Sequence, residues 1–224
     1  MPQLLYLGLF VALVATPLLL ALLRRLRFNP FSLVPRLTLW VAAVVVLVIA
    51  AAKTDAWRVC LGLEWPTWQS LGLAILAAAA MFLVFGAHRY WQEKLGKESP
   101  KLIQQFQDIL RLPFSHRCFL VGTAAVTEEV LYRGYAIGVG QQLLGSVWLA
   151  CIVSVVAFTL AHMRWGLAHL LPVVVATLVC TLLFVFTQNL WPCIIAHAIV
   201  DTAAFLVMPA IMARKRPSTA PHAG

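Results

Sequence analysis

The chain has 224 residues, of which 62% are hydrophobic and only 11% are charged. A soluble domain carries about 25% charged residues, so this composition excludes an ordinary soluble fold and predicts a polytopic helical membrane protein. The formal net charge of +9 would suit nucleic acid in a soluble chain, but here the basic residues stand in short segments between apolar runs, as in cytoplasmic loops. We therefore expect the chain to contact a lipid bilayer and no nucleic acid.

Seven apolar runs predict an all-α bundle of about seven transmembrane helices, because the hydrocarbon core of a bilayer is roughly 30 Å thick. One run begins near Cys118, and the others cover about residues 4–23, 37–52, 70–87, 146–163, 170–187 and 190–212. Arginines follow the first run and none precedes it, so it is predicted to be a retained helix rather than a secretory signal. In the run from Cys118, four glycines predict a far end that stops or bends: Gly134, Gly138, Gly140 and Gly145.

A polar stretch, residues 88–117, follows the third run. Ser99-Pro100 is a helix-start signal, and apolar residues recur after it at helical spacing: Leu102, Ile103, Phe106, Ile109 and Leu110. This pattern predicts one amphipathic helix on the membrane surface, with a calmodulin-like partner helix as the alternative. The single membrane domain, residues 1–224, thus divides into a three-helix part (1–88), a surface segment (89–117) and a core bundle (118–212).

The basic residues predict the orientation of the chain. With the N-terminus outside, cytoplasmic segments would hold 14 lysines and arginines, outer segments would hold only Lys53 and Arg58, and Arg133 would lie within a span. Cytoplasmic loops carry the excess of lysine and arginine. The sequence therefore predicts a multi-pass protein with a cytoplasmic C-terminus, compatible with a bacterial inner membrane, and it specifies no oligomeric state.

Six ionisable residues fall inside the predicted spans, although charge is rare there: Glu128, Glu129, Arg133, His162, His197 and Asp201. An intramembrane carboxylate costs several kcal/mol and therefore indicates a functional site. The pairs Glu129 and Arg133, Phe158 and His162, and His197 and Asp201 are each four residues apart, so each pair shares one helix face. Three such faces turned inward would form one polar cavity.

The two adjacent glutamates are expected to point in different directions. Glu128 is rotated by about 100° from Glu129 on a helix, so it need not share Arg133. On the expected spans, His162 lies nearer the cytoplasmic end than Glu128 and Asp201. A packing role is the alternative for any one of these residues, whereas the whole set favours chemistry.

A buried carboxylate beside a histidine can hold and deprotonate a water molecule, and a second histidine can donate to a developing oxyanion. These groups indicate an amide hydrolase without a serine or cysteine nucleophile. The chain has no GxSxG and no HExxH motif, and its five cysteines show no CxxC spacing, so the usual serine and zinc signatures are missing.

The ordered triplet Glu128-Glu129-x-x-x-Arg133, Phe158-x-x-x-His162 and His197-x-x-x-Asp201 resembles the signature of the CAAX-protease and bacteriocin-processing (CPBP, or Abi) family of intramembrane proteases. The resemblance covers about residues 118–205. It implies a glutamate-type endopeptidase that needs no metal cofactor and acts near the C-terminus of a membrane-tethered protein or peptide substrate. Bacteriocin maturation and the processing of C-terminal sorting tails are among the family's tasks.

The resemblance also implies roles for individual residues. Glu128 with His162 would activate water, His197 with Asp201 would form the oxyanion side, and Glu129, Arg133 and Phe158 would shape the site. The third motif of the family often ends in asparagine, and an ionised Asp201 cannot donate a hydrogen bond. A zinc site made of Glu128, His162, His197 and Asp201 is therefore kept as an alternative.

Two other functional classes stay open from the sequence. A proton-coupled transporter component would use Glu128 and His162 as relay groups. Transporters usually show paired repeats in both halves, whereas here the charges counted inside spans all lie in the second half. A non-catalytic scaffold or immunity membrane protein is the third class.

Overall fold

The computed structural model describes residues 3–96, 104, 107–163 and 170–208. Every regular element in these ranges is a helix, so the predicted all-α bundle is confirmed. Three helical rods come first: α1 (Gln3–Phe10) with η1 (Val11–Ala15) and α2 (Thr16–Arg25), then α3 (Leu33–Lys53), then α5 (Trp68–Lys94) after the short α4 (Trp57–Cys60). The second half holds α7 (Phe114–Glu129), η2 (Val130–Val139), α8 (Gly140–Leu144), α9 (Val147–His162), α10 (Leu170–Thr187), α11 (Leu190–Thr202) and η5 (Ala203–Val207).

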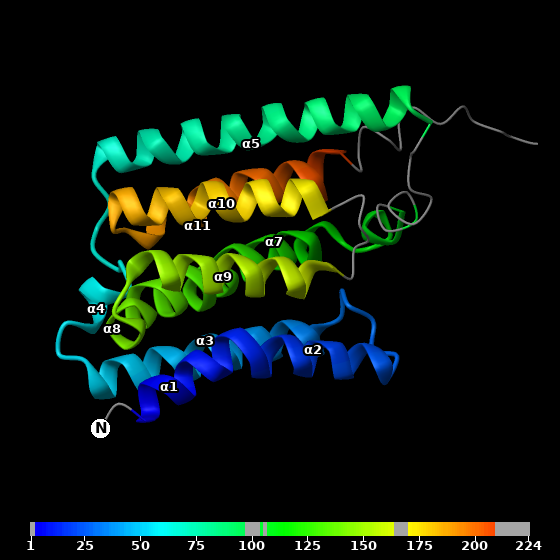
Figure 1. The fold of residues 1–224 in the computed structure, drawn as a ribbon. Coiled ribbons are helices and arrows are strands. Elements are labelled where there is room, and N and C mark those ends of the chain that lie inside the picture. Colours follow the sequence, from blue (N-terminus) through cyan, green and yellow to red (C-terminus); the bar gives the residue numbers. More distant parts are fainter. Residues whose placement is uncertain (1–2, 97–103, 105–106, 164–169, 209–224) are drawn as a thin grey trace, which may run out of the picture.

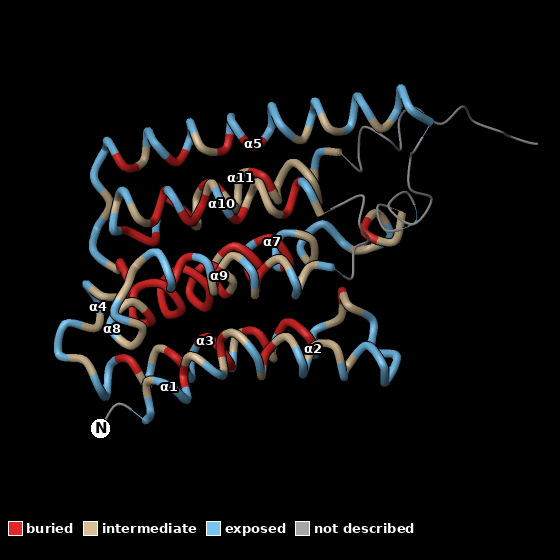
Figure 2. Tube along the Cα trace, viewed as in Figure 1, coloured by how far each residue is buried: buried red, intermediate tan, exposed pale blue. Residues whose placement is uncertain are grey.

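The rods lie side by side in layers (Figure 1). The α1–α2 rod and α3 form one outer layer, α7–η2 and α9 form the middle, α10 and α11 form the next, and α5 covers the opposite outside. Figure 2 shows buried residues gathered on the middle layer, where all ten residues of η2 are buried. The residues that could carry chemistry are therefore at the centre of the bundle.

Among the described residues, five helical rods are long and apolar enough to cross a membrane: Gln3–Arg25, Leu33–Lys53, Trp68–Lys94, Leu170–Thr187 and Leu190–Val207. The apolar α9 is shorter, with 16 residues. The rod of α7, η2 and α8 is long, but every 18-residue stretch of it includes Glu128, Glu129 and an arginine. A membrane-embedded bundle is thus confirmed, and the count of seven spans stays a prediction.

Local sequence explains where the helices begin and end. Side-chain oxygens of Thr67, Ser146 and Asn189 accept hydrogen bonds from backbone N–H groups in the first turns of α5, α9 and α11, which satisfies donors that the helix cannot pair itself. The rod of α7, η2 and α8 ends at Gly145, whose φ of 68° lies in the left-handed region. The run was expected to stop or bend at its four glycines: it ends at Gly145, while Gly134 and Gly138 lie inside the π-helical η2 and do not end it.

Close packing explains why residue 138 is a glycine. A Cβ atom at this position would collide with the carbonyl oxygen of Cys60, so only glycine lets η2 approach the end of α4 this closely.

One boundary differs clearly from the expected one. The third span was expected to end near residue 87, but α5 continues to Lys94, because no helix breaker intervenes and Arg89 pairs with Glu93 at 2.9 Å. Part of the predicted surface segment (89–117), namely residues 97–103 and 105–106 with Leu102, Ile103 and Phe106, lies outside the described residues, as do residues 209–212 of the seventh run. The described Ile109 packs into a small buried cluster with Phe31 and Leu120.

Candidate active site

Glu129 lies at the centre of a closed polar network. Its side chain is 0% exposed, and its Oε1 accepts a hydrogen bond from Arg133 Nη1 at 3.0 Å. His197 Nδ1 lies 2.8 Å from the same oxygen. A carboxylate oxygen accepts, so Nδ1 is the donor in this bond. The contact joins α7 to α11, which sequence spacing alone does not predict.

Arg133 connects this network to two further helices. Its Nη2 donates to the hydroxyl of Thr177 at 2.7 Å and to the Thr177 carbonyl at 3.1 Å. Its guanidinium also lies over the ring of Phe158, with Cζ 4.8 Å from the centroid, a cation–π arrangement that is strongest when it is desolvated. Removing either Arg133 or Glu129 would leave the other charge buried without compensation.

His197 is held between two carboxylates. Its Nε2 lies 3.5 Å from Asp201 Oδ2, one helical turn away, while Nδ1 contacts Glu129. A neutral imidazole donates from only one nitrogen, so favourable contacts on both sides require one further proton, carried by His197 or by Asp201. The side chains of His197 and Asp201 are 15% and 18% exposed, which leaves this edge of the network accessible.

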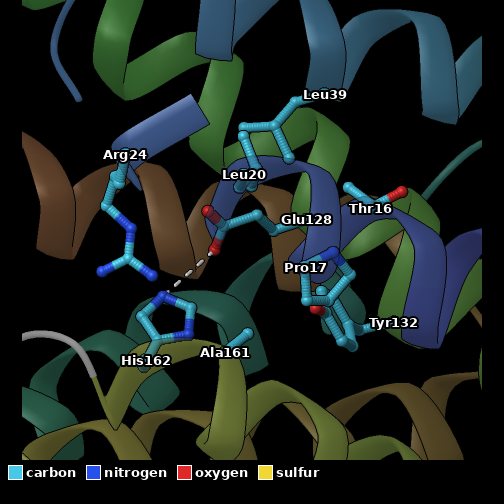
Figure 3. A pocket seen from close by; sticks show the side chains of 9 residues that line it. All are labelled: Thr16, Pro17, Leu20, Arg24, Leu39, Glu128, Tyr132, Ala161 and His162. Atoms are coloured by element: carbon cyan, nitrogen blue, oxygen red, sulfur yellow. Dashed lines mark ion pairs between the residues drawn. The ribbon is translucent and has the colours of Figure 1, made fainter. Parts of the chain in front are cut away.

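Glu128 points away from that network and pairs with His162. Glu128 Oε2 and His162 Nε2 are 3.7 Å apart (Figure 3). His162 Nδ1 lies 2.9 Å from the carbonyl oxygen of Phe158, which can only accept, so in a neutral ring Nε2 presents its lone pair to Glu128. A water oxygen placed about 2.8 Å from both atoms would fit beside the line that joins them.

A small pocket opens beside this pair. It offers about 30 Å³ to water-sized molecules, room for about one or two waters. Figure 3 shows Glu128 and His162 on its wall, with Arg24 beside them. The other lining residues are Thr16, Pro17, Leu20, Leu39, Tyr132 and Ala161.

Phe158 joins the two halves of the site. Its ring stacks on the ring of His162, with centroids 4.2 Å apart and an interplanar angle of 18°. The same ring lies beneath Arg133 and meets Tyr132 edge-on at 4.9 Å. This single side chain therefore fixes His162 relative to the Glu129 network.

The structure brings Glu128 and His162 together although the expected spans placed His162 nearer the cytoplasmic end. Both residues stand 17 positions from Gly145, one before it and one after it. In an antiparallel pair of α-helices, residues at equal distances from the turn lie about level with each other, because each residue adds a rise of about 1.5 Å; the π-helical η2 makes this relation approximate here. Counting from the glycine turn would have paired them from the sequence.

The four alternative zinc ligands do not gather around one point. They divide into the pair Glu128 and His162 and the pair His197 and Asp201. Within the ranges that the structure describes, no group of three or more His, Cys, Asp or Glu side chains is arranged to hold a metal ion. The alternative zinc set therefore does not fit this geometry.

Arg36 is a member of the site that sequence reasoning missed. It was counted as a cytoplasmic loop residue, but it is buried near the start of α3 with 7% exposure. Its Nη2 donates to the Pro30 carbonyl at 3.2 Å, and its charge interacts electrostatically with Glu128 and Asp201. The available signal was an arginine at the edge of an apolar run rather than in the middle of a polar loop.

Comparison with known proteins gives one family match. The model of the family described as type II CAAX prenyl endopeptidase Rce1-like matches residues 112–203. This range contains the carboxylates, the histidines and Arg133, while Arg24 and Arg36 lie outside it. No curated protein and no solved structure matched the chain.

Proposed function

We propose that the chain acts in the way of the Rce1-like family of type II CAAX prenyl endopeptidases, because the model of this family matches residues 112–203. The protein is an intramembrane endopeptidase that hydrolyses a peptide bond near the membrane surface, close to the C-terminus of a membrane-tethered protein substrate. The observation that carries the proposal is the Glu128–His162 pair, 3.7 Å apart on the wall of a water-sized pocket.

In the proposed reaction, a water molecule donates one hydrogen bond to Glu128 and the other to His162 Nε2. Glu128 takes a proton as the water oxygen attacks the carbonyl carbon, and the carbonyl oxygen becomes an oxyanion. When the C–N bond breaks, Glu128 returns that proton to the leaving amine. His162 positions the water, because the Phe158 carbonyl and the stacked Phe158 ring hold its imidazole in place.

The oxyanion side is assigned to His197 and Asp201. The additional proton that this pair carries can form a hydrogen bond to the oxyanion that develops on the substrate carbonyl. A preorganised donor at this position stabilises the transition state. Glu129 and Arg133 serve as positioning residues. Glu129 Oε1 accepts a hydrogen bond from His197 Nδ1 at 2.8 Å, and Arg133 donates a hydrogen bond that holds Glu129 in place.

The pocket is proposed to face the cytoplasm. In Figure 1, the end of α2, the start of α3, the end of α5 and the start of α7 lie at one end of the bundle, whereas the end of α3 and α4 lie at the other. By sequence position, the first group of helix ends carries Arg24, Arg36, Lys94 and Arg117, and the second carries Lys53 and Arg58. Basic residues mark the cytoplasmic side, and Arg24 lines the pocket. The membrane is proposed to be a bacterial inner membrane with the N-terminus outside, which labelling of single introduced cysteines with an impermeant reagent would test.

The test uses two substrates: a farnesylated peptide ending in the CAAX pattern, and a single-span protein with a short C-terminal tail. Each is incubated with the reconstituted protein and with Glu128→Ala, with and without a metal chelator. Glu93→Ala serves as a matched control, because Glu93 is an exposed glutamate on α5. Product from wild type and Glu93→Ala alone, unaffected by chelator, is the expected result.

The remaining outcomes separate the alternatives. If wild type forms product without the chelator but not with it, the metal-free mechanism is wrong and the reaction depends on a metal. Absence of product from both substrates would contradict the peptidase proposal for these substrate classes. Proton flux in sealed vesicles would then distinguish a transporter component from a scaffold.

A further inference from the structure

Arg24 is the one basic residue on the wall of the described pocket beside Glu128 and His162. It belongs to the last turn of α2, and Figure 3 shows its guanidinium beside the Glu128–His162 pair. Among the residues that the structure describes, this guanidinium has no hydrogen-bond or ion-pair partner. A positively charged guanidinium thus faces the pocket, and its donors are not used by the part of the chain that the structure describes.

The neighbouring Arg25 provides the contrast. Both arginines are exposed in the last turn of the same helix, so both have the position expected of residues that contact lipid headgroups. Only Arg24 lines the pocket that contains Glu128. A role in binding lipid explains both residues equally, whereas a role in binding substrate applies to Arg24 alone.

A guanidinium recognises planar oxyanions, above all a carboxylate, through two parallel hydrogen bonds. A peptide substrate that is cut near its end always carries one such group, its own terminal carboxylate. We propose that Arg24 binds the free C-terminal carboxylate of the substrate and so selects peptide bonds close to the C-terminus. This inference rests on the proposed peptidase function and adds to it the residue that reads the substrate's end.

The shared pocket limits how far the carboxylate lies from the bond that is cut. Arg24 and Glu128 line the same pocket, and each residue of an extended peptide spans about 3.3 Å. A peptide that reaches both side chains along the open side of this pocket therefore has only a few residues between its terminal carboxylate and the carbonyl that Glu128 attacks. Internal peptide bonds lack a neighbouring carboxylate and are poor substrates for the same reason.

The experiment compares two farnesylated CAAX peptides that differ only at the C-terminus, one with a free acid and one with an amide. Their kcat/KM values are measured with wild type, Arg24→Gln, Arg24→Lys and Arg25→Gln. Wild type is expected to favour the acid by roughly 10- to 100-fold, the range for a hydrogen-bonded charge pair. Arg24→Gln removes this preference, Arg24→Lys retains part of it, and Arg25→Gln behaves as wild type.

A binding measurement separates this inference from the proposed chemistry. The same peptides are titrated against Glu128→Gln and against Glu128→Gln/Arg24→Gln. Preferential binding of the acid that disappears in the double variant supports carboxylate recognition even if wild type cleaves neither peptide, in which case only the peptidase proposal fails. Equal affinity for acid and amide, or equal effects of Arg24→Gln and Arg25→Gln, would overturn the assignment of Arg24.

Discussion

Two adjacent residues, Glu128 and Glu129, differ in burial and in their contacts. Glu129 is completely buried and shares one oxygen between Arg133 and His197. Glu128 is 12% exposed, faces a pocket and approaches His162 only to 3.7 Å. The site thus has a closed region around Glu129 and an open region around Glu128, and one helix supplies both.

The difference follows from helix geometry. Neighbouring residues on a helix are rotated by about 100°, so one carboxylate turns toward α10 and α11 while the other turns toward the α1–α2 rod. The closed region pairs the charge of Glu129 with that of Arg133, although Glu129 Oε2 and Arg133 Nε have no hydrogen-bond partner among the described residues, and such pairing is required of charged groups at membrane depth. The open region places its hydrogen-bonding groups on the wall of a water-sized pocket, which a reaction with water requires.

Glu128→Gln is expected to have the largest effect, and only on activity. Losing the proton acceptor should lower kcat by about 10²- to 10⁴-fold, while the free energy of unfolding should change by less than about 1 kcal/mol, as for groups without tight partners. Cleavage assays together with SDS-induced unfolding in detergent would check both. A large loss of stability would contradict the separation into open and closed regions.

Arg133→Met is expected to destabilise the closed region by about 3–5 kcal/mol, because it leaves Glu129 buried without its main counter-charge. Unfolding in detergent measures this. Arg111→Met is the control, since Arg111 is 76% exposed and lies 3.6 Å from Asp108, and exposed pairs contribute about 0–1 kcal/mol. Adding Glu129→Leu to Arg133→Met should recover part of the stability; no recovery would mean that packing, rather than charge, dominates.

Arg36→Met tests whether the open region depends on charge from outside the matched family segment. Arg36 carries a positive charge that interacts with Glu128 and Asp201. Removing this charge should raise the reaction barrier by on the order of 1–2 kcal/mol, the size of a charge interaction at an effective dielectric constant near 20. Such a change lowers kcat/KM by about tenfold. Arg36→Lys should restore part of the rate. Equal rates for Arg36→Met and wild type would remove Arg36 from the site.

Asp201→Asn is expected to have the smallest effect. Asp201 is partly exposed and lies 3.5 Å from His197, and an amide can also donate to an oxyanion. Cleavage should change by less than about tenfold, which is the effect of 1.4 kcal/mol. A complete loss of cleavage would mean that the carboxylate itself, and not its position beside His197, is needed.

The sequence predicted the contacts that lie within one helix. Glu129 with Arg133 and His197 with Asp201 are each one turn apart, and both pairs form. The all-α membrane bundle was also accessible, because composition and apolar run length report it directly. The proposed catalytic roles were drawn from the family resemblance and stay predictions.

Contacts between helices were harder to predict. The bond between Glu129 and His197 joins residues 68 positions apart, and their relative rotation depends on how α7 and α11 pack. Arg36 was missed because positive charge near a span end is usually a loop residue. Periodicity places a side chain on a face of its own helix, but it does not say which neighbour that face meets.

The equal spacing of Glu128 and His162 from Gly145 has a consequence for sequence variation in relatives. Inserting one residue between Gly145 and His162 would rotate the imidazole by about 100° and shift it by about 1.5 Å, which would move it away from Glu128. Insertions and deletions between residues 128 and 162 should therefore be rare, or should come in compensating pairs on both sides of the turn. Connections outside this hairpin, such as the segment between α5 and α7, should vary freely in length.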